Sequence, residues 1–283
     1  MPRDVGYATD LAFTPVYRDC VTTGCLPEHT LVGGNAWVPK LLQNPLWRLS
    51  AENESAYQDK TILQAEAMLR KAATLTVTLT TSDTVKIATV RVVNHTGHKL
   101  PTGYPEGRQM WVNLQAFDSS NQMIYESGAY NSVTGQLNRD ADVKVYEAKQ
   151  GITPELATVL GLNPGESFHF VLNNAVIKDN RIPPKGYSPA LFDQPGLRPV
   201  GVTYLDGQYW DDTVYILPLE TDRVRVTLYY QTSSREYINF LQFNGGVDGL
   251  TLSQLWAESK SPPKIMAQAW LPGFISFFPL IMK

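Results

Sequence analysis

The chain has 283 residues, of which 43% are hydrophobic and 18% are charged, and these proportions exclude a disordered or fibrous protein. Its 24 Lys and Arg residues stand against 27 Asp and Glu residues, which gives a net charge of −3 without a concentrated basic run. Nucleic acid is therefore excluded as an expected partner, because phosphate neutralisation requires clustered Lys and Arg. The length allows one large domain with appendages or two modest domains.

The first part of the chain has the pattern of an arm followed by a helix. Residues 1–50 contain Pro, Gly and Asn throughout and show no sustained hydrophobic period, so we expect an irregular arm that lies on a surface outside it. Over residues 51–73, apolar side chains recur at helical spacing among good helix formers: Ile62, Ala65, Leu69 and Ala72. This stretch predicts one long connecting helix.

The rest of the chain, residues 74–283, has the pattern of a β-rich domain. Period-two alternation begins here, and strands are expected at 75–79, 85–93, 110–117, 122–126, 143–148, 167–172, 213–217 and 223–231. Strands with one apolar face cannot form an open sheet that is wet on both sides, so two packed sheets are required. We predict a mainly β fold, a β-sandwich (Ig-like), with short C-terminal helices at 236–242 and 253–259.

Cys20 and Cys25 are the two cysteines of the chain, and they lie in a segment rich in Pro, Gly and Thr. In an oxidising compartment they are candidates for a disulfide loop, whereas in the cytoplasm they would be free thiols. A zinc site is disfavoured, because a tetrahedral site needs four ligands and only His29 lies nearby in sequence. The spacing leaves both the disulfide and the free thiols open.

The two ends of the chain differ in hydropathy. Residues 1–13 contain no apolar core of a signal peptide, which by itself favours a cytoplasmic protein. Residues 270–282 are nearly all apolar, but Pro and Gly interrupt the run, which is shorter than the roughly 20 residues that a spanning helix needs. We expect no transmembrane segment and interpret this tail as buried or facing a partner, with membrane contact as the alternative.

The most unusual segment is 94–111, NHTGHKLPTGYPEGRQMW, which predicts a long ordered loop between strands. His95 and His98 could bind a metal or haem iron through neutral imidazole, and Glu106 could add a carboxylate. The alternative is that the two histidines pin the loop by hydrogen bonds to its backbone. The residue types leave the metal unknown, and Arg108 is interpreted as an ion-pair partner that holds the loop.

Two further segments carry candidate ligands. In 27–37, PEHTLVGGNAW, His29 precedes a Gly-Gly-Asn turn and is either a surface histidine or a ligand for an iron held outside this chain. In 173–187, NNAVIKDNRIPPKGY, Asp179 and Asn180 could supply oxygens to calcium, but a calcium site needs six or more ligands. Turn formation by Asp and Asn before the Pro-Pro pair explains this segment more simply.

Catalytic signatures are absent from the sequence. It contains no G-x-S-x-G elbow, no phosphate-binding loop, no H-E-x-x-H and no dinucleotide-binding pattern after a strand. Most neighbourhoods hold a single histidine, so no catalytic triad can be proposed either. We therefore expect that the chain is not itself an enzyme.

Several of these strings resemble a signature of bacterial multihaem c-type cytochromes. The most specific part is the 94–111 block, with His95, Gly97, His98, Pro101, Gly103, Glu106, Arg108 and Trp111. Similar elements follow in the same order: Asp118, Glu126–Gly128, Tyr130, Lys178–Pro184, Tyr229–Tyr237 and Ser261–Pro263. The resemblance covers nearly the whole chain and matches the β-rich, haem-free C-terminal region of such a cytochrome.

In that family the haems are attached through C-x-x-C-H motifs in the N-terminal half, and the last motif is commonly followed by Met-Pro. This chain opens with Met1-Pro2-Arg3, so the resemblance implies that it begins just after a haem motif, through truncation, a late start codon or a split gene. The same cut would account for the missing signal peptide. Cys25 is followed by Leu26 and not by His, so no covalent haem is expected on this chain.

The resemblance makes His29 the preferred candidate for a distal axial ligand of a haem and leaves His98 as the second candidate. Haem c is expected in an upstream segment or partner, with a redox partner protein, in the periplasm or outside the cell. The expected function is a non-catalytic module that packs on haems and shields them in electron transfer. Two alternatives remain open. One is a stand-alone binding or adhesion module whose aromatic residues Trp37, Tyr209 and Trp210 contact a glycan or protein, and the other is a subunit of a multihaem oxidoreductase.

Overall fold

The computed structural model describes residues 3–9, 15–22, 25–27, 32–43, 54–104 and 106–271. By its internal contacts the chain divides into two compact units, Met1–Gly33 and Gly34–Lys283. The boundary lies inside the arm that the sequence predicts at 1–50. The last part of that arm therefore belongs to the larger unit.

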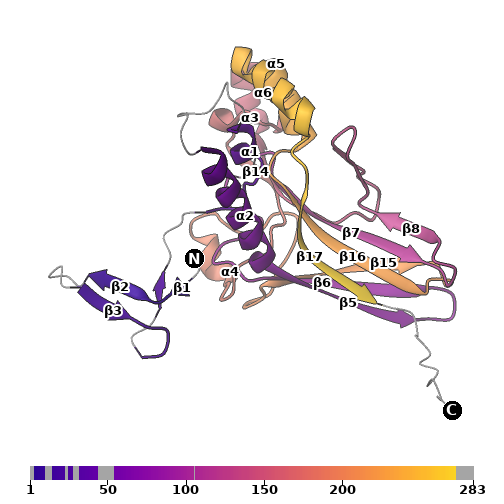
Figure 1. Cartoon of the computed structure of the whole chain (residues 1–283). Helices are drawn as coiled ribbons and strands as arrows, with labels where there is room; N and C mark the ends of the chain where they lie inside the picture. Colours follow the sequence, from indigo (N-terminus) through magenta and orange to yellow (C-terminus); the bar gives the residue numbers. More distant parts are fainter. Residues whose placement is uncertain are drawn as a thin grey trace. The chain divides into compact units, whose positions relative to one another are not determined.

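The described part of the N-terminal unit contains short strands: β1 (Arg3–Asp4), β2 (Gly6–Thr9), β3 (Pro15–Arg18) and β4 (Leu26–Pro27) (Figure 1). β1 pairs with β4 and β2 pairs with β3, both antiparallel. This stretch is therefore less irregular than the sequence predicts. Strands of two to four residues are too short to display a hydrophobic period, and so the pattern does not reveal them.

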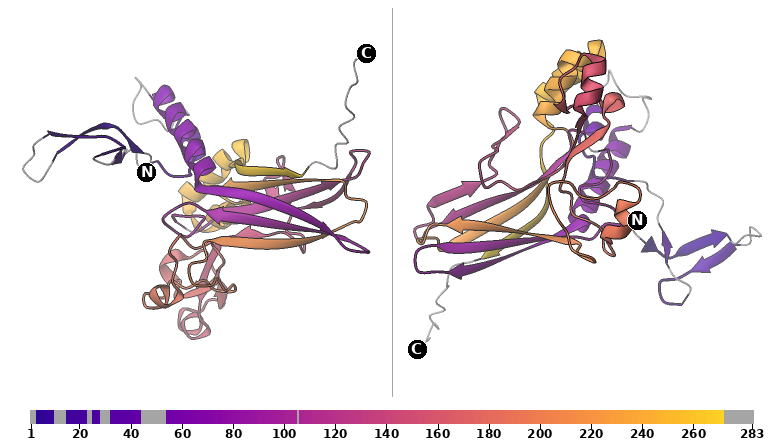
Figure 2. Two further views of the ribbon diagram at one scale, coloured as in Figure 1. Left: turned by 90° about the horizontal axis from the view of Figure 1, so that it is seen from below. Right: turned by 180° about the vertical axis from the view of Figure 1, so that it is seen from behind.

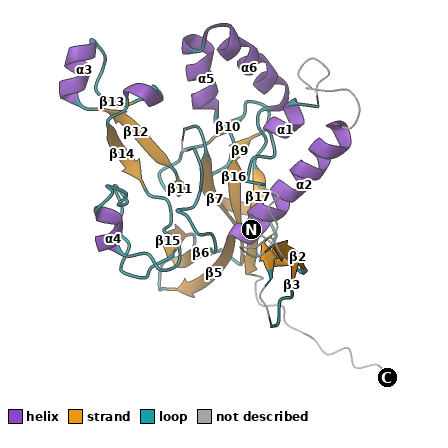
Figure 3. Cartoon of the chain, turned by 90° about the vertical axis from the view of Figure 1, so that its left-hand side faces the viewer, coloured by secondary structure: helices purple, strands orange, loops and turns teal. Residues whose placement is uncertain are grey.

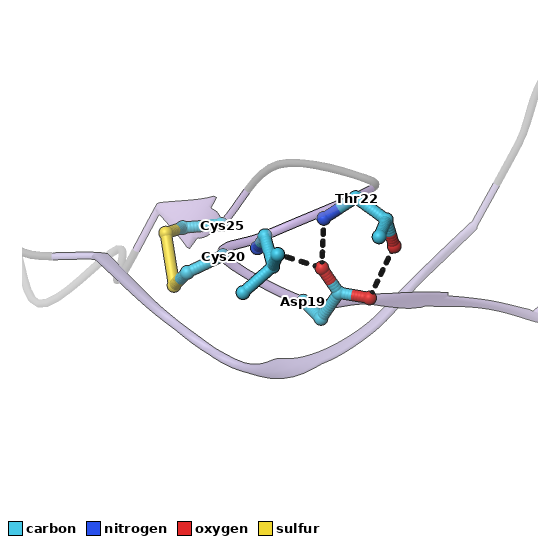
Figure 4. The surroundings of a disulfide bond; sticks show 5 residues. Asp19, Cys20, Thr22 and Cys25 are labelled. Atoms are coloured by element: carbon cyan, nitrogen blue, oxygen red, sulfur yellow. Dashed lines mark hydrogen bonds between the residues drawn. A yellow bond between two sulfur atoms is a disulfide. The ribbon is translucent and has the colours of Figure 1, made fainter.

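Cys20 and Cys25 form a disulfide bond in this unit (Figure 4), which is one of the two alternatives that their spacing leaves open. Asp19 also holds this turn, because its carboxylate accepts hydrogen bonds from the N–H of Val21 at 2.7 Å and from Oγ1 of Thr22 at 2.6 Å. Covalent closure lowers the entropy of the unfolded chain. A unit of short strands with little core of its own gains stability in this way.

The larger unit is built on two antiparallel sheets (Figure 1; Figure 2). One sheet has the order β15–β6–β5, made of β5 (Ala73–Thr81), β6 (Lys86–Asn94) and β15 (Trp210–Leu217). The other has the order β11–β7–β16–β17, with β8 also paired to β7. Its strands are β7 (Gln109–Phe117), β8 (Met123–Ser127), β11 (Val145–Tyr146), β16 (Arg223–Gln231) and β17 (Lys264–Leu271).

The hydrophobic core lies between these two sheets. Along β7 every second side chain points inward, and Met110, Val112, Leu114 and Ala116 are fully buried. They belong to one cluster with inward residues of the opposite sheet, such as Val90 of β6. Two sheets with one apolar face each must pack face to face to bury it. The predicted mainly β, sandwich-like fold is confirmed.

A long helix, α2 (Glu54–Ala72), leads directly into β5 and corresponds to the helix expected over 51–73. Its Leu69 and Ala72 belong to the sandwich core, and Ala65 one turn earlier is also buried. Glu66 on the same helix forms an ion pair of 2.7 Å with Lys264 of β17. The helical period of small and apolar residues thus places α2 against the sandwich.

Three other helices pack around a small second cluster in which Trp37 contacts Ile238 and Trp256. Trp37 is only 4% exposed, so the expectation that it is an exposed contact residue is wrong. Its indole N–H donates to Oγ of Ser259 at 2.7 Å, so this buried polar group has a hydrogen-bond partner. The helices are α1 (Val38–Leu41), α5 (Arg235–Asn244) and α6 (Gly246–Ser259), and the last two include the expected C-terminal helices.

Smaller elements complete the unit: β9 (Tyr130–Asn131), β10 (Gln136–Leu137), β12 (Ala148–Ile152), α3 (Pro154–Leu160), β13 (Gly165–Glu166), η1 (Phe170–Leu172), β14 (Ala175–Asp179) and α4 (Pro189–Asp193). β9 pairs with β10, and β12 pairs with both β13 and β14. Figure 3 shows α3 and β12–β14 on the opposite side of the sandwich from α2.

The strand expected at 167–172 is wrong, because Phe170–Leu172 form a turn of 3₁₀ helix. The carbonyl of His169 accepts the N–H of Leu172 at 2.8 Å and so closes a local turn. Phe168 packs its ring on Phe240 of α5, with centroids 5.5 Å apart, instead of facing a neighbouring strand. A short run with period-two polarity has here been mistaken for a strand.

The apolar tail is only partly described. β17 includes Trp270, which is 54% exposed, and ends at Leu271. Residues 272–283 lie outside the described residues, so the expectation for the tail stays a prediction. Among the helices of the described ranges, none has the length and hydropathy that crossing a membrane requires.

Candidate functional site

The 94–111 block connects the two sheets of the sandwich. Asn94 ends β6 in one sheet and Gln109 begins β7 in the other, so residues 95–108, the crossover loop, carry the chain from sheet to sheet. The other strings that carry the family resemblance are distant in sequence. Hydrogen bonds nevertheless connect several of them to this loop or to its flanks.

The side chain of Asn94 is the centre of these connections. It is fully buried, and its Nδ2 lies 2.8–2.9 Å from the carbonyl oxygens of His98, Ile182 and Pro183. Its Oδ1 accepts hydrogen bonds from the N–H and the hydroxyl of Thr96, both at 2.8 Å. One amide thus folds the start of the crossover loop back on itself and joins it to the 178–184 string.

Backbone pairing strengthens the same junction. Leu100 and Ile182 form an antiparallel bridge in which each N–H donates to the other carbonyl at 2.9 Å. Both side chains belong to the sandwich core, at 2% and 0% exposure. The peptide bond between Leu100 and Pro101 is cis. The 94–111 block and the 178–184 string therefore form one paired structure.

Asp179 holds two cations at this junction. Its buried carboxylate contacts Lys99 of the crossover loop and Arg181, the latter at 2.8 Å. Burial acts to raise the pKa of Asp179, but the hydrogen bonds and charges of Arg181 and Lys99 outweigh it and hold this pKa below its usual value. The side-chain amide of Asn180 accepts a hydrogen bond from the N–H of Glu147 and donates one to the carbonyl of Val145. These groups are already engaged, which fits a structural role for the segment and not calcium binding.

The C-terminal strings attach to the other end of the crossover loop. The N–H of Ser234 donates to the carbonyl of Gly107 at 2.8 Å, and Nε2 of Gln109 donates to Oε1 of Gln231 at 2.7 Å. Gln231, which is fully buried, donates in turn to the carbonyl of Ser261 at 3.0 Å. The 229–237 and 261–263 strings are therefore parts of the same hydrogen-bonded network.

Trp111 closes the block from the β7 side. Its side chain is fully buried, and its indole N–H donates to the carbonyl of Gly128 at 3.1 Å. Its ring stacks on Tyr229 with centroids 5.3 Å apart and lies 5.9 Å from the ring of Tyr130. The residues from the 126–130 elements and the 229–237 string thus meet at this tryptophan.

The two histidines of the loop are exposed. Nε2 of His95 lies 3.0 Å from the hydroxyl of Thr74 on β5, so this histidine pins the loop through a side chain, where a backbone group was expected. The ring of His98 has no hydrogen-bond partner in the part of the chain that the structure describes. Within that part, no three His, Cys, Asp or Glu side chains gather. His29 lies outside the described residues, and its ligand role stays a prediction.

Arg108 holds the loop, but not by an ion pair. Its Nη1 donates to the carbonyl of Thr102 at 3.0 Å, and no carboxylate of the described ranges lies within ion-pair distance. Gly103, with φ +87°, lies under this guanidinium, and a Cβ there would come within 2.0 Å of Nη1. Glycine is therefore favoured at 103 by its positive φ, and a larger residue would also displace the end of the Arg108 side chain. Nothing in the structure explains the glycine at 97.

Glu106 is the unusual group of the loop. It is 6% exposed, neither carboxylate oxygen makes a hydrogen bond of normal geometry within the described ranges, and the nearby hydroxyl of Tyr104 offsets only part of the effect of burial. Burial raises its pKa above the usual value, because the charged form is poorly solvated there. Neighbouring Tyr104 has a pKa raised to about 12 by burial and by the charge of Glu106. At neutral pH the charged carboxyl group therefore lowers the free energy of unfolding.

A cavity of about 240 Å³ lies beside the loop and is lined by charged side chains that neutralise one another. Glu147, which is 6% exposed, pairs with Arg139 at 3.1 Å and with Lys178 at 2.9 Å. Lys149 pairs with Glu166 at 2.9 Å. Burial acts to raise the pKa of Glu147, but the contacts with Arg139 and the lysines lower it overall. These charged side chains are therefore paired with one another.

Sequence patterns did not single out a set of exposed apolar side chains on η1, α5 and α6. We call this set the apolar end, and it consists of Phe170, Val171, Phe243 and Val247. These side chains are 51%, 90%, 81% and 79% exposed, respectively. Phe170 contacts Tyr104 of the crossover loop, with ring centroids 5.3 Å apart. The string FHFVL at 168–172 could have indicated this surface, because a strand over these residues would have had to bury one apolar face against another element.

Asn94 provides the first test of the network. Asn94→Ala removes the donor shared by three carbonyl oxygens and the acceptor of two hydrogen bonds from Thr96, and each hydrogen bond lost costs about 0.5–1.5 kcal/mol. We expect a loss of about 3 kcal/mol in the free energy of unfolding, measured by urea titration. Asn244→Ala, which removes an amide from an exposed helix position, is the control and should cost less than about 0.5 kcal/mol. Equal losses would contradict the central role of Asn94.

Asp179 gives a test with a defined pH dependence. Its pKa is depressed in the folded state, so its stabilisation is complete above about pH 4, the unfolded value, and is lost as the pH falls through the folded value. Asp179→Asn should cost about 3–5 kcal/mol at pH 7, and the difference should shrink in acid. Thermal unfolding across pH measures this. Asp212→Asn, which breaks the exposed pair with Arg91, should cost less than about 1 kcal/mol, and an equal cost would refute the argument.

Glu106 predicts the opposite sign. Its raised pKa means that the folded state loses stability as the pH rises above about 4, where the unfolded carboxyl ionises. Glu106→Gln should therefore raise the melting temperature at pH 7–8 by about 2–4 °C, and the gain should vanish below about pH 4. Glu258→Gln, on the exposed face of α6, should change nothing. A destabilised Glu106→Gln variant at pH 8 would show that Glu106 has a partner.

No family model matches the chain, and no curated protein matches it. Among solved structures, the chain is similar to a penta-haem cytochrome c552 from Thermochromatium tepidum, with 18% sequence identity and a TM-score of 0.46. The similarity covers 73% of this chain and 41% of that chain. This chain therefore spans less than half of the length of the structure that it matches.

Proposed function

We propose that this chain is a non-catalytic module of an extracytoplasmic multihaem cytochrome c, located in the periplasm or outside the cell. It carries no covalent haem of its own and packs on a haem-bearing segment or subunit, from which it excludes water. Any redox chemistry belongs to those haems. The proposal starts from the resemblance of the 94–111 block and its companion strings, and one structural observation supports it.

That observation is the apolar end. Val171, Phe243 and Val247 expose about four fifths or more of their side chains to solvent, at 90%, 81% and 79%. Soluble proteins rarely leave large apolar side chains gathered in this way unless a partner covers them. In Figure 1 α5 and α6 lie together at one end of the sandwich, away from the turn between β5 and β6, and the segment that leads into η1 packs on α5 through Phe168 and Phe240. A partner can therefore approach them together.

The aromatic base of the apolar end suits a haem partner. Phe168 packs against Tyr237 and Phe240, with ring centroids 5.4 and 5.5 Å apart, and the ring of His169 meets Phe240 edge-on at 4.9 Å. A haem is a flat, largely apolar macrocycle, and the polarity and water access of its surroundings tune its potential. A rigid apolar cover lowers both the polarity of these surroundings and the access of water to the haem.

The crossover loop links the recognised strings to this surface. Tyr104, whose ring contacts Phe170, projects from the loop that Asn94 and the Leu100–Ile182 bridge hold in place. In this proposal the 94–111 block acts as a scaffold that positions the cover. His29 is the preferred distal axial ligand for an iron of the partner, and the exposed His98 is the second candidate.

The experiment uses the full chain, tagged at its C-terminus and isolated from its native host. We expect the isolated complex to absorb in the Soret region with the spectrum of c-type haem. The double variant Val171→Asp with Phe243→Asp should lower the haem absorbance per chain at least about tenfold, because two charges would be buried against an apolar partner. Leu205→Asp, at a 71% exposed position outside the apolar end, is the matched control and should leave the absorbance unchanged.

Two outcomes contradict the proposal. A colourless complex would favour the stand-alone binding or adhesion module instead. Full haem absorbance with the double variant would place the haem contact on another surface. Turnover of a nitrogen or sulfur compound by the purified complex would assign the module to a multihaem oxidoreductase, with the same cover role.

A further inference from the structure

A cavity of about 300 Å³ lies on the outer face of the five-stranded sheet. Along β7 the residues Val112 and Leu114 point into the core, so Asn113 and Gln115 point to the other face. They line the cavity together with Glu126 of β8. Its volume is at the lower end of the range for small-molecule sites.

The polar groups of this cavity are held in a fixed array. Oε1 of Glu126 accepts hydrogen bonds from Nδ2 of Asn113 at 3.0 Å and from Nε2 of Gln115 at 2.7 Å. Oε1 of Gln115 accepts in turn from Nε of Arg225 at 2.7 Å. Each planar side chain is therefore oriented by its neighbour before a ligand arrives, which reduces the entropy cost of binding.

Two acceptors of this array remain without partners. Oε2 of Glu126 and Oδ1 of Asn113 make no hydrogen bond within the described ranges. Asn113 as a residue is only 7% exposed, but neither its amide oxygen nor Oε2 of Glu126 is among the buried atoms that lack a partner, so both acceptors open into the cavity. Acceptors that open into a cavity are available to a ligand that supplies hydroxyl or N–H groups in place of water.

Aromatic rings form another wall of the cavity. Tyr229 and Tyr130 both line it, and both contact the buried ring of Trp111 behind them, at 5.3 and 5.9 Å between centroids. The interplanar angle between Trp111 and Tyr229 is 29°, and the indole N–H is fixed on the carbonyl of Gly128. This wall offers rigid apolar faces beside the polar array.

The charges favour a neutral ligand. The ammonium of Lys260 also borders the cavity, but it donates to the carbonyl of Ala257 and lies 5.4 Å over the ring of Trp256. The remaining charge is the carboxylate of Glu126, which disfavours phosphate and other anions. The backbone at Lys260 and Ser261 has φ of +58° and +43°, an uncommon conformation for residues with side chains.

We propose that this cavity binds a neutral saccharide. The C–H face of a sugar ring packs on Tyr229, and two neighbouring hydroxyls donate to Oε2 of Glu126 and Oδ1 of Asn113. Planar amides and carboxylates can bond adjacent hydroxyls, while an aromatic ring supplies the apolar contact. This binding needs no haem and is independent of the apolar end, so the chain combines a haem-facing surface with attachment to a glycan.

The test is isothermal titration calorimetry of the full chain with three neutral probes, cellopentaose, chitopentaose and maltopentaose. We expect at least one of them to bind with a Kd of about 1 mM or tighter. Glu126→Gln keeps an oxygen for the amides of Asn113 and Gln115 but removes the free acceptor, and it should weaken binding at least about tenfold. Tyr229→Leu should do the same by removing the ring face. Glu220→Gln, on the turn before β16, should bind as the unmodified chain does.

Three results would overturn the proposal. One is the absence of binding to all three probes at concentrations of about 10 mM. Another is sugar binding that Glu126→Gln leaves unchanged while the melting temperatures of both proteins are equal, because the sugar would then occupy another site. The third is preferential binding of polygalacturonic acid or of an octaproline peptide, which would assign the cavity to an anion or to an extended proline-rich segment.

Discussion

The buried side-chain amide of Asn94 is the interaction on which the rest of the larger unit depends. A chain that passes from one sheet of a sandwich to the other must satisfy its backbone groups without a neighbouring strand. Here one amide meets three carbonyl oxygens, two of which belong to residues 88 and 89 positions away. The crossover is therefore held by side-chain and bridge contacts, and the loop exposes Tyr104 while it buries Glu106.

The sequence predicts the parts of the fold in which one physical signal repeats. The alternation of β7 and the helical spacing of Leu69 and Ala72 are long enough to define their faces. Short elements fail this test, as the strands of the first unit and the 3₁₀ turn at 170–172 show. α3 had a detectable start and end in Thr153, which caps it before a proline, and Gly161, which ends it with φ +66°.

The candidate site could be located from the sequence, but its connections could not. The 94–111 block indicates an ordered loop, yet no local pattern reveals that Asn94 meets Ile182 or that Gln109 meets Gln231. Such pairs form between distant segments after the sheets have packed. The apolar end and the outer cavity were missed for the same reason, because the polarity of a residue does not state whether another element covers it.

In our proposal a hydrogen-bonded network holds the crossover, and a separate surface, the apolar end, meets a haem partner. Hydrogen–deuterium exchange, compared between the isolated chain and the complex isolated from the native host, tests that separation most directly. New protection is expected at 168–172 and 240–250 in the complex, with the 94–100 and 178–184 segments protected equally in both samples. The proposal would be contradicted by unchanged exchange at the apolar end, or by a network that becomes protected only when the partner binds.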